Sequence, residues 1–180
     1  MAAAASRGLD LPEATVLATA DSRGRPSARF VLLKDVDERG FVFFTDARSR
    51  KGRELRDNPR AALVSYWHAP GWQVRVEGLV EPVSAAEADA YWITRPRASR
   101  LAAASSKQSA PLRRRRDLIT LVAQLRRRLA GRAVPRPRYW TGFRLIPERI
   151  EFWTLRAHRL HERELFVRKR GGWSQTLLQP

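Results

Sequence analysis

The sequence of 180 residues contains no cysteine, and none of its apolar runs approaches the roughly 20 residues that a membrane-spanning helix requires. The absence of cysteine excludes disulfides, thiolate metal ligands and thiol nucleophiles. The opening residues MAAAAS are small, but they lack the basic start and the long apolar core of a signal peptide. We therefore expect a soluble, cytoplasmic protein with no membrane partner.

Acidic residues are scarce: 18 of them stand against 35 basic residues, which leaves a net charge of +17 at pH 7. Such a surface attracts nucleic acids and small anions, although an excess of 31 arginines over 4 lysines is also typical of a genome that favours arginine codons. No specific nucleic-acid partner is expected, because the tryptophans lie in apolar segments instead of among the arginines, where they could stack on bases. These tryptophans are Trp67, Trp72, Trp92, Trp140 and Trp153.

The length predicts one domain over residues 14–180, preceded by a short segment, residues 1–13. Short apolar runs separated by turn residues fill the first half of the chain and predict an antiparallel sheet or barrel. After the third of these runs, Ser49 can cap a short helix that ends before Pro59. The expected strands are residues 15–20, 27–34, 41–45, 60–67 and 72–83.

Helices are expected in the middle third. Ser84 and Glu87 form a capping-box pattern that begins a helix, and Pro96 breaks or restarts it. A further helix has Gly131 as its C-cap and carries apolar residues at helical spacing, namely Leu118, Val122, Leu125 and Leu129. Strands return over residues 139–147, 149–155, 158–169 and 173–178. The pattern predicts a mainly β fold with flanking helices, of the α+β class.

One candidate anion site lies at the helix that Ser49 begins. Arg50 and Lys51 follow this cap, where the first turn of the helix presents free N–H groups and the positive end of its dipole. Two cations are unfavourable there unless a phosphate binds between them. The alternative is a helix that tolerates two exposed charges, and the sequence does not decide between these interpretations.

A second candidate site combines Tyr91 and Arg95, which share a helix face, with Ser99 close behind them. Two hydroxyls and a guanidinium suit an anion. Arg29 and Lys34 bracket the apolar residues FVLL, and strand alternation sends their side chains to opposite faces unless a bulge intervenes. This pair alone indicates edge charges as readily as a site.

The segment HRLHER, residues 158–163, contains two of the three histidines. At helical spacing His158 and His161 could share a metal ion, but the segment is expected to be a strand, in which they point to opposite faces. We therefore expect no metal site. The same alternation places Arg159, His161 and Arg163 on one face, where they could meet bound anions.

The sequence resembles the pyridoxamine/pyridoxine 5′-phosphate oxidases, the FMN enzymes of vitamin B6 synthesis, over residues 14–180. The motifs RFVLLK, FFTDARSRKG, WQVRVEG, YWITRPRAS, SSKQS, YWTGFR, IEFW and HRLHER occur in the family's order and close to its spacing. The resemblance implies an antiparallel, FMN-binding split barrel of Greek-key type. It also implies a homodimer whose active sites lie at the subunit interface.

The resemblance implies roles for individual residues as well. Contacts to the substrate phosphate would come from Lys34, Tyr91, Arg95 and Ser99. Arg159 and His161 would lie against the pyridine ring as the catalytic residues. The implied FMN contacts are Arg29, Lys34, Phe44, Thr45, Arg50, Lys51, Gln73, Gln108, Ser109, Trp153 and Arg163.

The implied reaction oxidises pyridoxamine or pyridoxine 5′-phosphate to pyridoxal 5′-phosphate, with O2 as acceptor and H2O2 as product. A related alternative is a split-barrel flavin oxidase of the phenazine-biosynthesis type, although HRLH and YWITRPRAS favour a B6 substrate. A less favoured alternative, from a different class, is a basic nucleic-acid-binding protein. Two departures from the family stand out. Phe44 replaces a common tyrosine, and the first expected strand begins at about Thr15, where family members usually have a longer N-terminal segment that can close over the substrate.

Overall fold

The computed structural model describes residues 11–180, so most of the expected N-terminal segment, residues 1–13, lies outside the described residues. The strands are β1 (Ala14–Ala20), β2 (Pro26–Asp37), β3 (Gly40–Asp46), β4 (Arg60–Trp67), β5 (Trp72–Pro82), β6 (Trp140–Thr154), β7 (Glu162–Lys169) and β8 (Gly172–Leu177). The helices are α2 (Arg50–Asp57), α3 (Ala85–Thr94), α4 (Arg97–Ser105) and α5 (Arg115–Leu129), with a short 3₁₀ turn, η1 (Ala157–Arg159). None of the described helices is both long enough and apolar enough to cross a membrane.

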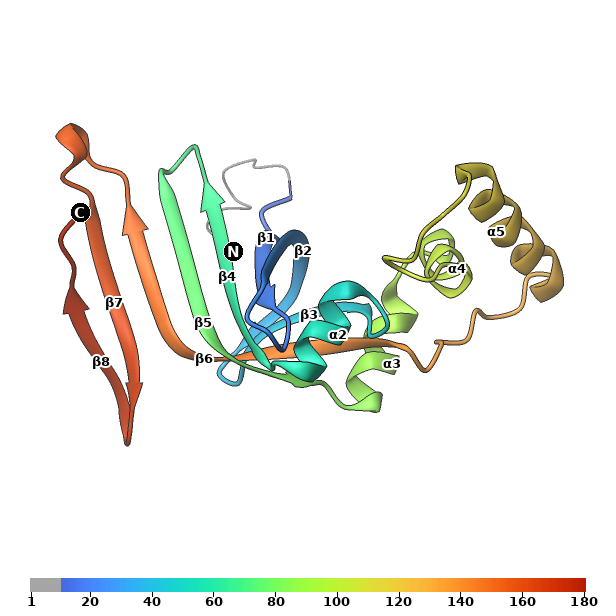
Figure 1. The fold of residues 1–180 in the computed structure, drawn as a ribbon, viewed down its shortest axis with the longest axis horizontal. Helices are drawn as coiled ribbons and strands as arrows, with labels where there is room; N and C mark the ends of the chain where they lie inside the picture. Colours follow the sequence, from blue (N-terminus) through green and yellow to red (C-terminus); the bar gives the residue numbers. More distant parts are fainter. Residues whose placement is uncertain (1–10) are drawn as a thin grey trace. The chain divides into compact units, whose positions relative to one another are not determined.

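The strands form one sheet in the order β3-β2-β1-β4-β5-β6-β7-β8, and β3 also pairs with β6 (Figure 1). This extra pairing closes β1 to β6 into a six-stranded barrel, whereas β7 and β8 continue the sheet beyond it. Since β4 returns beside β1, the order β3-β2-β1-β4 is a Greek key. The predicted fold class is confirmed: a mainly β, antiparallel split barrel with flanking helices.

The described chain forms two compact units. The barrel unit contains the described residues up to Phe43 together with Glu54–Glu81 and Arg144–Pro180. The helical unit contains Phe44–Arg53 and Pro82–Phe143. Helix α2 supplies residues to both units. A single domain over residues 14–180 stays a prediction.

The core of the barrel unit follows from the strand patterns. In β1 buried and half-buried residues alternate strictly, as a strand with one face toward a core requires. Leu17 and Leu145 are fully buried, and Leu63 and Val76 are nearly so. Glycine is required at position 78, because a Cβ there would lie 2.0 Å from the carbonyl oxygen of Ile146. Because Gly78 has no Cβ, β5 and β6 can approach each other closely.

The helical unit packs around Trp92, Leu101, Val134 and Trp140. The indole N–H of Trp92 donates to the Val134 carbonyl at 2.8 Å, so the buried ring keeps its polar atom satisfied. Val122, Leu125 and Leu129 pack against this cluster, as their helical spacing predicted. Of the other tryptophans that lie in apolar segments of the sequence, Trp67, Trp72 and Trp153 are only half-buried.

Helix boundaries match the predicted caps closely. Ser84 and Glu87 form both hydrogen bonds of the capping box. After Pro96 the chain restarts as α4, which the sequence left open. The C-cap of α5 is Ala130, with a left-handed φ of 46°, and not the expected Gly131.

Two strand predictions were wrong. The expected strands 139–147 and 149–155 are one strand, β6, which continues through Pro147. A proline interrupts a strand only where a neighbouring strand needs its missing N–H. The expected strand 158–169 begins only at Glu162, because His158 and Arg159 have positive φ values of 55° and 65° and form a turn.

Candidate functional site

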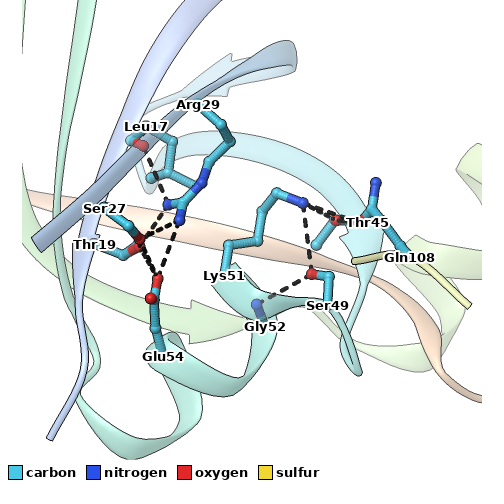
Figure 2. A network of polar contacts seen from close by, with 10 residues as sticks. All are labelled: Leu17, Thr19, Ser27, Arg29, Thr45, Ser49, Lys51, Gly52, Glu54 and Gln108. Carbon is cyan, nitrogen blue, oxygen red and sulfur yellow. Dashed lines mark hydrogen bonds and ion pairs between the residues drawn. The ribbon is translucent and has the colours of Figure 1, made fainter. Parts of the chain in front are cut away.

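The first turn of α2 gathers three of the expected cofactor contacts within the helical unit. Lys51 is only 8% exposed, and its ammonium donates to Thr45 Oγ1 at 3.0 Å and to Gln108 Oε1 at 2.9 Å (Figure 2). Thr45 Oγ1 also donates to the same Gln108 oxygen at 2.7 Å. The structure therefore brings together residues that are up to 63 positions apart in the chain.

The predicted cap accounts for the geometry of this turn. Ser49 is fully buried, and its hydroxyl accepts a hydrogen bond from the Gly52 N–H at 3.2 Å. A Cβ on Gly52 would lie 2.3 Å from the Ala47 carbonyl oxygen, so only glycine lets the turn pack this closely. Arg50 is exposed on the same turn, and Ser109 is exposed with a positive φ of 68°. A buried ammonium at a helix N-terminus creates a strongly positive environment that suits an anion.

Arg29, another expected cofactor contact, belongs to a separate network in the barrel unit. Its guanidinium donates to the Leu17 carbonyl, to the hydroxyls of Thr19 and Ser27, and to Glu54 Oε2 at 3.1 Å (Figure 2). Glu54 is only 5% exposed. Both terminal nitrogens of Arg29 are thus engaged inside the barrel unit, and Glu54 is the buried anion that holds them.

Glu54 was not among the predicted site residues. Within RKGRELRD it looks like an ordinary surface charge of a short helix. The available signal is its position three residues after Lys51 and one before the buried Leu55, which places it on the inward face of α2. The sequence offers no indication that Arg29 is its partner.

Lys34 lies at a β-bulge. The register between β2 and β3 shifts between Leu33 and Asp35, so a bulge interrupts the strict alternation of faces next to Lys34. The Lys34 ammonium is 3.4 Å from Glu13 Oε1. Lys34 also lines a cavity of about 560 Å³ in the barrel unit, whose other walls include Trp67 and Phe152. This volume is in the range of small-molecule sites.

The second candidate anion site lies in the helical unit, where aromatic rings form a stack. The Phe44 ring lies 4.1 Å from that of Tyr91 and 5.4 Å from that of Trp140. The Arg95 guanidinium lies over the rings of Trp92 and Trp140, at 5.1 and 4.7 Å. Phe44, expected at the flavin, therefore has its ring in contact with the wall that supports Arg95.

Arg95 presents an unsatisfied donor. Its Nη1 is buried and has no hydrogen-bond partner among the described residues. Burial lowers the pKa of the Arg95 guanidinium, the adjacent Tyr91 opposes this shift, and the positive charge of Arg100 adds to it. Ser99 lies in the first turn of α4, four residues after Arg95 in the chain. A buried, unpaired cationic donor is costly in the free protein, so this site is suited to an anionic ligand.

Three of the remaining predicted residues, Trp153, His161 and Arg163, lie near the start of β7 in the barrel unit. The rings of Trp153 and His161 are 4.6 Å apart, and Trp153 pairs with Arg163 across β6 and β7. Glu151 accepts from Arg163 Nε at 2.8 Å, and this hydrogen bond raises the pKa of Arg163. Gln73 is half-buried in β5, opposite Tyr66 of β4.

The expected common face of Arg159, His161 and Arg163 was wrong. Arg159 is exposed in the η1 turn with a positive φ, so strand alternation does not extend to it. His161 precedes β7, and its Nδ1 accepts the backbone N–H of Arg156 at 3.2 Å. Only Trp153, His161 and Arg163 are brought together here.

The closed six-stranded barrel with helical insertions defines the class of the protein as a split barrel. Its fold matches that of a pyridoxamine 5′-phosphate oxidase-related, FMN-binding protein from Nostoc punctiforme, with a TM-score of 0.81 at 21% identity, over 99% of this chain and 95% of that one. The match to PhzG from Burkholderia lata, solved with tetrahydrophenazine-1-carboxylic acid, has a TM-score of 0.95 at 37% identity. It covers 99% of this chain and 88% of that one.

Sequence comparison narrows this class to one family. A family model described as pyridoxamine 5′-phosphate oxidase matches residues 1–130, and a model of the pyridoxine 5′-phosphate oxidase C-terminal dimerisation region matches residues 140–180. The pyridoxine/pyridoxamine 5′-phosphate oxidase of Myxococcus xanthus is 53% identical, over 94% of this chain and 82% of its own. That of Rubrobacter xylanophilus is 54% identical, over 96% and 80%. The chain belongs to the pyridoxamine 5′-phosphate oxidase family.

Proposed function

We propose that the protein is an FMN-dependent oxidase that converts pyridoxamine or pyridoxine 5′-phosphate to pyridoxal 5′-phosphate, with O2 as acceptor and H2O2 as product. The observation that carries this proposal, in a chain of this family, is the buried Nη1 of Arg95 beside the aromatic stack, which has no hydrogen-bond partner in the described part of the chain. A phosphate ester would supply the acceptor that this donor lacks. The family relatives named above act, by their names, on such phosphates.

The donor groups present fit FMN. The N-terminus of α2, the buried ammonium of Lys51 and the exposed guanidinium of Arg50 suit the FMN phosphate. Thr45 and Gln108 offer neutral hydrogen-bonding groups on the same network. The residues proposed to hold FMN are Arg29, Lys34, Phe44, Thr45, Arg50, Lys51, Gln73, Gln108, Ser109, Trp153 and Arg163. The chemistry that FMN would supply at these residues is acceptance of a hydride equivalent from the substrate, followed by reoxidation by O2.

The protein's own residues bind and orient the substrate in this proposal. Lys34, Tyr91, Arg95 and Ser99 hold its phosphate, while Arg159 and His161 lie against the pyridine ring. Fixing two planar anions with respect to each other lowers the entropic cost of the reaction. A guanidinium and an imidazole can stabilise the changes in electron density at the ring nitrogen and the ring hydroxyl during the reaction. No residue of this set is assigned as a general base.

The match to a dimerisation region supports a homodimer. We propose that each active site draws residues from both subunits. Exposed apolar side chains support a buried contact on the barrel unit: Phe30 and Leu177 are each 74% exposed, and Trp173 is 44% exposed. The cytoplasmic location expected from the sequence stays a prediction.

The rival function is oxidation of a phenazine precursor, since PhzG is also similar in sequence and fold. The expected site favours a phosphate, because Tyr91, Arg95 and Ser99 are all present and Arg95 has an unsatisfied donor. A carboxylate offers fewer acceptor oxygens and half the charge of a phosphate monoester.

The test uses the purified protein loaded with FMN. With pyridoxamine 5′-phosphate under air, we expect equal amounts of pyridoxal 5′-phosphate, followed by its absorbance, and of H2O2, followed by a peroxidase-coupled assay. Tetrahydrophenazine-1-carboxylic acid is the comparison substrate. A protein that binds no FMN, or that oxidises only the phenazine, would refute the proposal.

A further inference from the structure

Arg100, which follows Ser99 in the first turn of α4, is outside every role assigned above. Its Nε is buried and has no hydrogen-bond partner among the described residues, a property it shares with Nη1 of Arg95. Buried polar atoms in native proteins are nearly always hydrogen-bonded. Two unpartnered guanidinium donors in one unit are therefore an unusual combination, and they are separated by only five positions of chain.

Three other arginines of the helical unit have protein partners. Arg97, on the same helix, donates to the Arg132 carbonyl, Arg136 pairs with Asp89 at 2.6 Å, and Arg48 pairs with Asp46 at 2.8 Å. No carboxylate among residues 11–180 forms an ion pair with Arg95 or Arg100. Among the described residues, Arg95 and Arg100 thus have no counter-ion, whereas Arg48, Arg97 and Arg136 have protein partners.

The two guanidiniums are also close enough to influence each other. The charge of Arg100 is one of the causes that lower the pKa of Arg95. Arg95 is the C-cap of α3 and Arg100 lies in the first turn of α4, so Pro96 holds them on adjoining helix ends. Two positive charges on adjoining helix ends repel each other unless a shared anion lies between them.

We propose that Arg100 is a second phosphate-binding residue, and that together with Arg95 it makes the site selective for a dianionic phosphate monoester over a monoanionic carboxylate. This inference rests on the proposed function and names the specificity determinant of its substrate site. A phosphate monoester carries nearly two negative charges near neutral pH and has three terminal oxygens. Two guanidiniums can share those oxygens through charge-assisted hydrogen bonds, whereas a carboxylate satisfies one guanidinium in a single fork.

The experiment compares Arg100→Gln with the wild-type FMN-loaded enzyme. The variant should raise the KM for pyridoxamine 5′-phosphate and the Kd for pyridoxal 5′-phosphate by about tenfold or more, the loss expected for one charge-assisted hydrogen bond, with kcat changed little. Turnover of unphosphorylated pyridoxamine should stay the same. Inorganic phosphate should inhibit the variant at least about tenfold more weakly, because the variant lacks one charge-assisted hydrogen bond to the phosphate.

Arg97→Gln is the matched control. It removes a charge from the same helix, but the guanidinium of Arg97 already has a protein partner. It should change these constants less than about twofold, as expected for a partly exposed charge that binds no ligand. An Arg100→Gln enzyme with unchanged affinity for pyridoxal 5′-phosphate and inorganic phosphate would overturn the inference. Equal losses for the phosphorylated and unphosphorylated amines would overturn it too, because they would indicate general disruption of the site.

A measurement on the wild-type enzyme covers the case in which Arg100→Gln does not fold. Saturating pyridoxal 5′-phosphate should protect Arg100 from modification by phenylglyoxal, as mapped by mass spectrometry of the peptides, and absence of protection would overturn the inference. Failure of the proposed function can be distinguished from failure of the inference about Arg100. A wild-type enzyme that does not oxidise pyridoxamine 5′-phosphate can still be tested with inorganic phosphate as the protecting ligand.

Discussion

Replacement of Glu54 by glutamine tests the buried network around Arg29. Glu54 Oε2 accepts hydrogen bonds from Thr19 Oγ1 at 2.5 Å, from Ser27 Oγ at 2.7 Å and from Arg29 Nη2 at 3.1 Å. The Glu54 side chain is 6% exposed and that of Arg29 is 21% exposed. Glutamine has nearly the same shape but removes the negative charge and turns one acceptor into a donor.

The size of the effect follows from these contacts. Removing one partner of a buried ion pair typically costs about 3–5 kcal/mol, because the other charge is left unpaired. The partial exposure of Arg29 lets water replace some of the lost interaction, which lowers the expected loss to about 2–3 kcal/mol. For a chain of this size, that loss corresponds to a decrease in Tm of about 5–10 °C.

The assay is urea unfolding of the FMN-free protein at one fixed protein concentration, with Tm from calorimetry as a second measure. Glu148→Gln is the matched control, because Glu148 forms a single ion pair with Arg60 at the surface of the same unit, with side chains 47% and 64% exposed. Its expected cost is well below 1 kcal/mol. Equal stabilities of the Glu54→Gln and Glu148→Gln proteins would refute the argument that the network is a buried and stabilising one.

Three further predictions concern single residues. Lys51→Met should weaken FMN binding by about 10–100-fold in a flavin-fluorescence titration, since it removes a charge-assisted contact from the proposed phosphate site, and unchanged affinity would contradict that assignment. Arg159→Ala should impair turnover of pyridoxamine 5′-phosphate while leaving bound flavin largely intact, and loss of flavin as its main effect would contradict the proposed division of roles. Burial raises the pKa of Asp37, but hydrogen bonding to Arg39 and the charge of Arg144 outweigh it and hold that pKa below the ordinary value. Such a group stabilises the fold above its unfolded pKa and loses this contribution as the pH falls through its folded pKa, so Asp37→Asn should reduce stability near neutral pH and narrow its difference from wild type in acid. A constant difference at all pH values would show that titration of Asp37 does not contribute.

Local features of the fold could be predicted from local sequence. The alternation in β1, the Ser49 cap and the Ser84–Glu87 capping box each depend on residues within one element, and all three are present. Errors arose where a local rule met a tertiary constraint. Pro147 did not end β6, and the positive φ values at His158 and Arg159 replaced an expected strand with a turn.

Site residues divide in the same way. The residue types around Lys51 and Arg95 made anion sites one interpretation of the sequence, and at Lys51 the alternative of an exposed charged helix stayed open. The partners of those residues could not be predicted, because Gln108 lies 57 positions from Lys51 and Glu54 lies 25 positions from Arg29. Contacts of this range depend on which strands and helices become neighbours.

The sequence by itself determined the family, the antiparallel barrel class and the identity of the expected binding residues, since motifs, caps and hydrophobic patterns are properties of contiguous chain. Tertiary structure alone decided that β3 pairs with β6 to close the barrel and that a bulge lies at Lys34. It also decided that Arg29 binds Glu54, whereas Arg95 and Arg100 keep buried donors that have no partner within residues 11–180. Whether a buried charge is satisfied depends on every group that packs around it, and packing brings those groups from distant parts of the chain.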